Sequence, residues 1–203
     1  MNTREKLSAI LIGLGLILAI IPLTSNSSFT AKPKNLLNEV IDANRTFTVD
    51  QVARLISIED STLQLIDLRP AAEFAKMNIP GSVNFPYTDF LNNDPGLILS
   101  DNNMKYVFYS NGDLHSGYAL AIAKGMKYNN TFIMKGGLNE WFAKVMNTSF
   151  SGDAISAREN ALFEARTKAK RMFTEFNLLP DSMKMKYMQA RLGDAKKLDG
   201  GCE

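Results

Sequence analysis

The middle of the chain alternates short apolar runs with segments of helical periodicity. Three apolar runs, each bounded by polar residues, predict buried strands at Leu63–Ile66, Tyr106–Tyr109 and Thr131–Met134. Helices are expected at 48–56, 71–77, 116–124 and 138–145, the first of them opening with a capping box from Thr48 to Gln51. Strands that alternate with helices predict a parallel sheet with both faces covered. The expected fold class is therefore α/β, with a small parallel sheet flanked by helices.

The N-terminal segment has a different pattern. Leu7–Leu23 runs without a charge after Arg4 and Lys6. A helix of this length spans roughly 25 Å, slightly less than the core of a bilayer at about 30 Å. We interpret it as an uncleaved membrane anchor, with a cleaved signal peptide and a buried soluble helix as the alternatives. The basic start predicts that the rest of the chain lies outside the cytoplasm, in the periplasm if the source is bacterial; cleavage would release it there or as a secreted protein.

The C-terminal segment is rich in helix-forming and charged residues. Helices are expected over 154–177 and 182–192, separated by Pro180. The resulting organisation has four parts: 1–30 as anchor or signal peptide and linker, 31–44 as linker and short helix, 45–146 as the domain, and 147–203 as a helical extension.

Composition adds little beyond this pattern. Apolar residues make up 45% of the chain and charged residues 22%, and the net charge is +2. Such a small net charge gives no reason to expect a nucleic-acid partner. No metal ligand set and no cofactor motif is recognised.

Three stretches along the predicted domain carry a family resemblance. The first is Asp67-Leu68-Arg69 followed by Glu73-Phe74 and Ile79-Pro80-Gly81; the second is the loop from Ser110 to Ser116 after a strand; the third is Gly136-Gly137 followed by Trp141. In this order the sequence resembles the rhodanese-like domains over residues 45–146. The resemblance implies a loop that starts with a catalytic cysteine, which accepts sulfur as a persulfide. It also implies that Asp67 and Arg69 brace the loop.

The loop predicts an anion-binding cradle on physical grounds as well. It comprises Ser110, Asn111, Gly112, Asp113, Leu114, His115 and Ser116. We expect six residues to connect the strand to the helix, with Gly112 at positive φ so that the backbone curls. Backbone N–H groups that converge above a helix N-terminus favour an anion, or a thiolate if one is present.

This sequence departs from the family pattern where the chemistry would occur. Ser110 stands at the position of the family cysteine, and a hydroxyl forms no stable sulfur carrier. His115 falls where many members have Arg, and Asn78 falls where most have His. A triad of Ser110, Asp113 and His115 is not expected, because residues on one tight loop seldom face one another as that mechanism requires. These departures favour a loss of the sulfurtransferase mechanism, with no catalytic residue predicted.

Cys202 is the sole cysteine, near the end of the chain after Gly200 and Gly201. It is interpreted either as a tail residue without a role or as a thiol that reaches the loop. The main hypothesis is accordingly an inactive, membrane-anchored rhodanese-like module that binds an anion or a protein. One alternative is a thiosulfate or persulfide sulfurtransferase that uses Cys202 or a partner's thiol, and the other is a structural protein that acts through its helical tail.

Overall fold

The computed structural model describes residues 32, 34, 38, 42–93, 95–149 and 156–198. The strands are β1 (Thr46–Phe47), β2 (Leu63–Asp67), β3 (Val83–Asn84), β4 (Lys105–Tyr109) and β5 (Thr131–Met134). The α-helices are α3 (Val49–Ser57), α4 (Ala71–Lys76), α5 (Tyr87–Asn92), α6 (Gly96–Leu99), α7 (Asp113–Gly125), α8 (Gly137–Trp141), α9 (Ala157–Leu178) and α10 (Asp181–Leu198). A 3₁₀ turn, η1 (Ala43–Arg45), precedes β1, and a π-helical turn, η2 (Phe142–Met146), continues α8.

A parallel sheet forms the centre of the described chain. Its five strands lie in the order β1-β5-β4-β2-β3, and all four pairs of neighbouring strands are parallel. In the register between β2 and β4, Asp67 lies opposite Tyr109. The ends of the two central strands therefore meet at one edge of the sheet, and the predicted α/β class with a flanked parallel sheet is confirmed.

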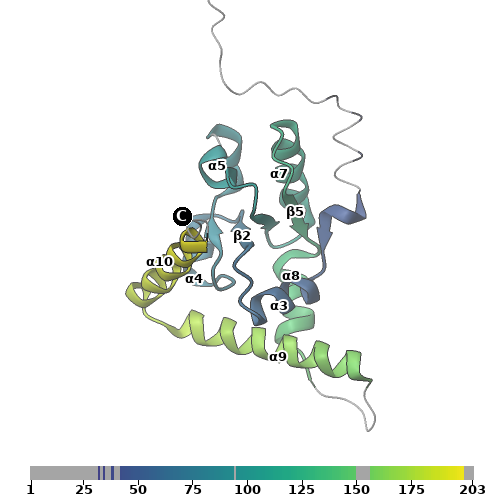
Figure 1. Ribbon diagram of the computed structural model, residues 1–203, viewed down its shortest axis with the longest axis vertical. Helices are drawn as coiled ribbons and strands as arrows, with labels where there is room; N and C mark the ends of the chain where they lie inside the picture. Colours follow the sequence, from purple (N-terminus) through teal and green to yellow (C-terminus); the bar gives the residue numbers. More distant parts are fainter. Residues whose placement is uncertain are drawn as a thin grey trace, which may run out of the picture.

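Helices cover both faces of the sheet, and each face has its own apolar core. One core packs α3, α8 and α9 against the sheet around Trp141 and Tyr109. The other packs α5, α6 and α7 around Phe108 and Leu120. In Figure 1, α9 runs along one side of the molecule beneath α3 and α8, and α10 folds back from its end. The C-terminal extension thus contributes a helix to the first core.

Local sequence signals explain several of these elements. Thr48 and Gln51 form the predicted capping box, in which the Thr48 hydroxyl accepts from the Gln51 N–H and the Gln51 side chain accepts from the Thr48 N–H. The three predicted strands are confirmed within a residue of their bounds. The pattern missed β1, α5 and α6, because elements of two to six residues carry too few positions to show a period.

The predictions for the N-terminal and C-terminal segments compare differently with the structure. The predicted anchor at Leu7–Leu23 lies outside the described residues. Within the part of the chain that the structure describes, none of the helices has the length and apolar character needed to cross a membrane. In the tail, α9 begins after a capping box at Ser156 and Glu159, and α10 continues to Leu198 rather than ending at Leu192.

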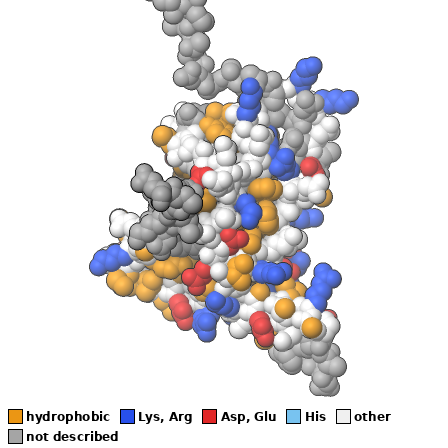
Figure 2. Space-filling model, viewed as in Figure 1, with side chains coloured by type: hydrophobic (Ala, Val, Ile, Leu, Met, Phe, Trp, Pro, Cys, Tyr) orange, Lys and Arg blue, Asp and Glu red, His pale blue; other side chains and the backbone are white. Residues whose placement is uncertain are grey.

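The surface of the tail includes a group of exposed apolar side chains. Leu178, Met183 and Met185 are 80%, 47% and 62% exposed. They belong to the corner where α9 passes into α10, and hydrophobic side chains gather at this corner in Figure 2.

Candidate functional site

The candidate site lies where β2 and β4 end. The main chain of β2 continues alongside the end of β4, since the Leu68 N–H donates to the Tyr109 carbonyl at 2.9 Å. Ser110 follows directly and is 5% exposed. Its position at the carboxyl edge of a parallel sheet is the usual location of ligand sites in open α/β folds.

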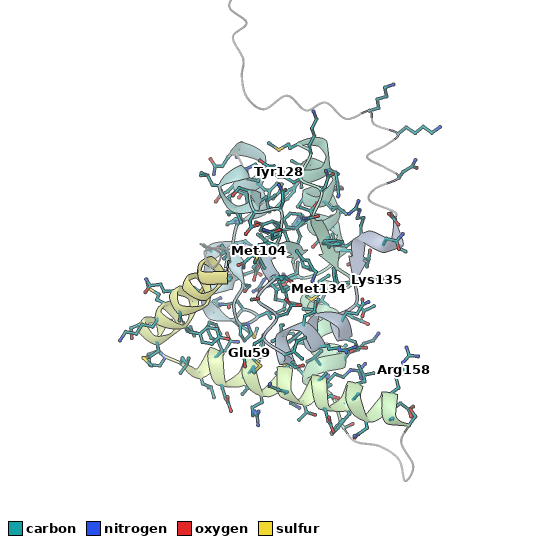
Figure 3. The ribbon with its side chains drawn as sticks, viewed as in Figure 1. Glu59, Met104, Tyr128, Met134, Lys135 and Arg158 are labelled. Carbon is teal, nitrogen blue, oxygen red and sulfur yellow. The ribbon has the colours of Figure 1, made fainter. Side chains whose placement is uncertain are left out.

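The loop after β4 is fixed from one side by α8. The Leu138 N–H donates to the Ser110 carbonyl at 2.9 Å, and the Asn139 N–H donates to the Asn111 carbonyl at 3.1 Å. The loop carbonyls therefore occupy N–H groups at the start of α8 that have no acceptor within their own helix. Lys135 and Met134, labelled in Figure 3, mark the end of β5 from which the chain turns into this helix.

These contacts determine where the loop N–H groups point. In a trans peptide the C=O and the N–H are antiparallel, so the Asn111 and Gly112 N–H groups point away from α8. The first N–H groups of α7 also lack acceptors within the helix, and Gly112 supplies no side-chain cap. The backbone at this edge can thus present several donors to an anion.

The loop is shorter than the sequence analysis predicted. The helix begins at Asp113, so only Ser110, Asn111 and Gly112 connect it to β4, and Asp113–Ser116 form its first turn. The prediction of a positive φ at Gly112 is wrong, because its φ is −144°. An extended conformation is the ordinary one for the residue that caps a helix N-terminus. Next to the loop, positive φ angles occur instead at the start of α8, at Gly136 with 76° and Gly137 with 56°.

Gly137 is required by the approach of the loop. A Cβ atom at this position would overlap the Ser110 carbonyl oxygen and would lie 2.9 Å from the Asn111 carbonyl. A Cβ at Gly112, by contrast, would meet nothing within 4 Å. In the sequence Gly137 stood out only as part of the Gly136-Gly137 motif, and nothing there indicated that it is the position that lets the loop dock on α8.

A buried ion pair lies on the other side of the loop. The Arg69 guanidinium donates to both carboxylate oxygens of Asp67, at 2.6 Å to Oδ2, and to the Met77 carbonyl at 2.7 Å. Burial opposes the charge of Arg69, but the hydrogen bond and charge of Asp67 outweigh it, so the pKa of the guanidinium is raised. Glu73 lies 3.9 Å from Arg69 and accepts from the Asn111 side chain at 3.2 Å. The predicted pair thus reaches the loop through Glu73, and its bracing role stays a prediction.

Tyr109 connects the end of β4 to the segment after α4. Its hydroxyl accepts from the Ile79 N–H at 3.3 Å and donates to the Ser82 hydroxyl at 2.9 Å. Burial, followed by the charge of Asp67, raises the pKa of Tyr109 well above its usual value. The phenol is a neutral structural group, which the sequence pattern identified only as a core residue.

The remaining predicted loop residues lie around the first turn of α7. The Asp113 carboxylate accepts from the Gly136 N–H at 2.5 Å. His115 is exposed and stacks on Tyr87, with ring centroids 4.8 Å apart. Leu114 is 63% exposed, whereas Ser116 is buried and its hydroxyl has no hydrogen-bond partner. Asp113 and His115 are thus engaged with Gly136 and Tyr87, which leaves Ser110 without the partners that a triad needs.

None of the residues that the structure describes is a cysteine, so the described part of this edge supplies no thiol. Cys202 is the sole cysteine of the sequence and lies outside the described residues. The described residues also contain no cluster of three or more His, Cys, Asp and Glu side chains placed to hold a metal ion. What the site offers chemically is a set of backbone donors, the Ser110 hydroxyl and the acidic side chains of Glu73 and Asp113.

Comparisons with known proteins agree with this architecture. The model of the rhodanese-like domain family matches residues 48–144. A curated relative from Saccharomyces cerevisiae, thiosulfate:glutathione sulfurtransferase, is 26% identical over 107 residues, which cover 48% of this chain and 77% of the relative.

Two solved structures are similar over a comparable part of the chain. An uncharacterised protein from Saccharomyces cerevisiae is 25% identical with a TM-score of 0.43, over 49% of this chain and 91% of that one. A protein of unknown function from Rhodopseudomonas palustris, described as a possible tyrosine phosphatase, is 24% identical with a TM-score of 0.46, over 56% and 91% of the two chains. The family match ends within η2, so α9 and α10 lie beyond it.

Proposed function

Because residues 48–144 form a rhodanese-like domain, we propose that this chain is a rhodanese-like module that binds an anion or a protein at the Ser110 loop and carries no sulfur there. In this proposal Ser110 occupies the position of the cysteine on which sulfur transfer in the family depends. The supporting observation is the geometry of the loop: its carbonyls bond to α8, its N–H groups face away, and the residue at its start is a serine. The arrangement keeps the donors that stabilise an anion and lacks the thiolate that would attack sulfur.

The N-terminal segment is the basis for a proposal about where the chain is located in the cell. We propose that Leu7–Leu23 anchors the chain in a membrane and that the domain lies outside the cytoplasm, in the periplasm of a bacterial source. The support is the apolar run after two basic residues. Release as a secreted or periplasmic protein after cleavage is the alternative.

A second candidate function is sulfur transfer with a thiol from elsewhere. The relative from Saccharomyces cerevisiae is named thiosulfate:glutathione sulfurtransferase, which favours thiosulfate as a sulfur donor for this chain as well. Cys202 or a partner's cysteine would attack the outer sulfur of thiosulfate, form a persulfide and release sulfite. Cyanide would then remove that sulfur as thiocyanate and regenerate the thiolate.

The deciding experiment measures thiocyanate formed from thiosulfate and cyanide by the full chain in detergent. We expect the natural chain and a Ser110→Ala control to be inactive. A Ser110→Cys variant should exceed that control at least about tenfold, because the loop N–H groups and the α7 N-terminus favour a thiolate at this position.

Each other result has a definite meaning. Activity of the natural chain that disappears in Cys202→Ser would replace the first proposal with the second. An inactive Ser110→Cys variant that is folded and has a free thiol would show that the loop no longer supports the reaction of the family.

A further inference from the structure

Helix α9 lies beyond the segment that the family model matches, yet it completes the core beside the site. Ala169, Phe173 and Phe176 are 0%, 3% and 4% exposed. The Phe173 ring lies 6.2 Å from Trp141 and 5.7 Å from Phe142, measured between ring centroids. Since Trp141 ends the helix on which the Ser110 loop docks, α9 supports that helix from behind.

Near its end, α9 also makes a polar contact with the segment after α4. The Asn177 side-chain amide accepts from the Asn78 N–H at 3.0 Å and donates to the Asn78 carbonyl at 2.9 Å. It donates further to the Phe173 carbonyl at 2.8 Å, within its own helix. A single side chain therefore pairs with both main-chain groups of Asn78, as a neighbouring strand would.

The segment that Asn177 holds makes contact with β4, the strand that precedes Ser110. Beside Asn78, the Ile79 N–H donates to the Tyr109 hydroxyl, and the Met77 carbonyl accepts from Arg69. Tyr109 is the last residue of β4. Displacement of this segment would remove a hydrogen bond from the buried Tyr109 hydroxyl and another from Arg69, and such buried groups are costly to leave unpaired.

From these contacts we infer that Asn177 is a positioning residue for the Ser110 loop, acting through Asn78, Ile79 and Tyr109. The inference rests on the proposed function only in taking the Ser110 loop as the site. It does not require that the chain has any activity. It makes α9 part of the site's support, and it gives the C-terminal extension a role that the family match does not cover.

Another residue of α9 provides a matched control. The Arg166 guanidinium donates to the two carboxylate oxygens of Asp50 at 2.6 and 2.7 Å, and thereby joins α9 to the first turn of α3. The hydrogen bond to Asp50 raises the pKa of Arg166. Unlike the contact of Asn177, this one leads to α3 and not to the segment at Tyr109. Both residues attach α9 to the domain, but of the two only Asn177 bonds to the segment that contacts Tyr109, the residue before the loop.

The test places one reporter thiol in the loop. In the full chain carrying Ser110→Cys and Cys202→Ser, the rate of alkylation by iodoacetamide is measured against pH, and its midpoint gives the thiol pKa. Asn177→Ala should raise that pKa by about one unit, because a displaced loop no longer directs its N–H groups at the thiolate. Arg166→Ala should leave the midpoint in place, although both variants should melt at a lower temperature.

A third variant and the separate readout keep the outcomes distinct. Asn177→Asp retains the acceptor for the Asn78 N–H but places a carboxylate oxygen against the Asn78 and Phe173 carbonyls, so a raised pKa is expected here too, and this variant decides the matter if Asn177→Ala does not fold. Equal midpoints in the Asn177 and Arg166 variants would overturn the inference. Failure of the proposed function would appear elsewhere, in the sulfur-transfer assay, because alkylation requires no activity.

Discussion

Two helix N-termini meet at the same edge of the sheet, and they are used in opposite ways. At α8, the N–H groups of Leu138 and Asn139 are bonded to loop carbonyls. At α7, Gly112 offers no side-chain cap, so it supplies no acceptor to the first-turn N–H groups, which have none within the helix. The first terminus is a structural support for the loop, and the second is a potential binding surface.

The difference shows how one loop can be held rigidly and still offer hydrogen-bond donors to an anion. Each peptide unit has one acceptor and one donor on opposite sides, so the bonds that fix the carbonyls to α8 also orient the donors away from it. The support and the binding surface are thus two sides of the same peptide units. Disturbing the α8 side should damage the α7 side, whereas the reverse need not hold.

The largest expected effect comes from Gly137→Ala. The added Cβ would overlap the Ser110 carbonyl, and alanine is strained at the observed φ of 56°. We expect a loss of about 3 kcal/mol or more in the free energy of unfolding, measured by urea denaturation. Gly112→Ala is the control and should change stability by less than about 1 kcal/mol, since its Cβ meets nothing within 4 Å. Similar losses in the two variants would contradict the contrast between the termini.

Tyr109→Phe should have an intermediate effect. It leaves the Ile79 N–H without its acceptor and should cost about 1–3 kcal/mol at neutral pH. In the natural protein the raised pKa of Tyr109 means that the folded state binds its proton more tightly than the unfolded state. This contribution is complete below about pH 10 and is lost as pH rises further.

The pH dependence provides the check on this variant. The stability gap between the natural chain and Tyr109→Phe should narrow between pH 10 and pH 11 in urea denaturation series, at about the ordinary tyrosine pKa. Tyr106, whose pKa is also raised, is present in both proteins and cancels in the difference. A gap that stays constant with pH would mean that Tyr109 ionises as easily in the folded state as in the unfolded one.

Asp113→Asn should have the smallest effect on stability and should sharpen the electrostatic side of the comparison. Asparagine keeps an acceptor for the Gly136 N–H, so the loss should stay below about 1 kcal/mol. Removing a negative charge from the first turn of α7 should tighten sulfate binding about threefold, measured by calorimetric titration at low salt. Glu140→Gln removes the acid at the start of α8, which pairs with Lys144 at 2.7 Å, and should leave sulfate affinity unchanged. Equal gains in the two variants would assign the effect to net charge alone.

The three longer strands and most of the helices that cover the sheet were predictable because their signals are local, whereas β1, α5 and α6 were missed. The apolar run at Tyr106–Tyr109 and the capping box at Thr48 each specify an element within a few residues. The start of α7 was not predictable from the same information. Asp113, Leu114 and His115 do not continue the apolar spacing of the helix, since all three are exposed, and so they read as a loop.

The candidate site was predictable only in part. The order of motifs predicted a loop after β4 that begins at Ser110, and the structure has this loop, but the residues that support it were not predicted. Gly137 and Asn177 are 27 and 67 positions from Ser110 in the sequence. Their contacts depend on how α8 and α9 pack, which no local pattern records. The predicted conformation of Gly112 was wrong for the same reason, because the close approach that requires a glycine occurs at Gly137 of α8.

The burial of Trp141 has a practical consequence for observing the molecule in solution. It is the sole tryptophan of the chain, it is fully buried, and it packs on Phe173 of α9. Indole emission shifts to longer wavelength on contact with water, so this chain carries an intrinsic fluorophore at the seam between the family domain and its extension. A shift of the emission to longer wavelength would therefore report the exposure of Trp141 when α9 separates from the domain, in the unmodified protein.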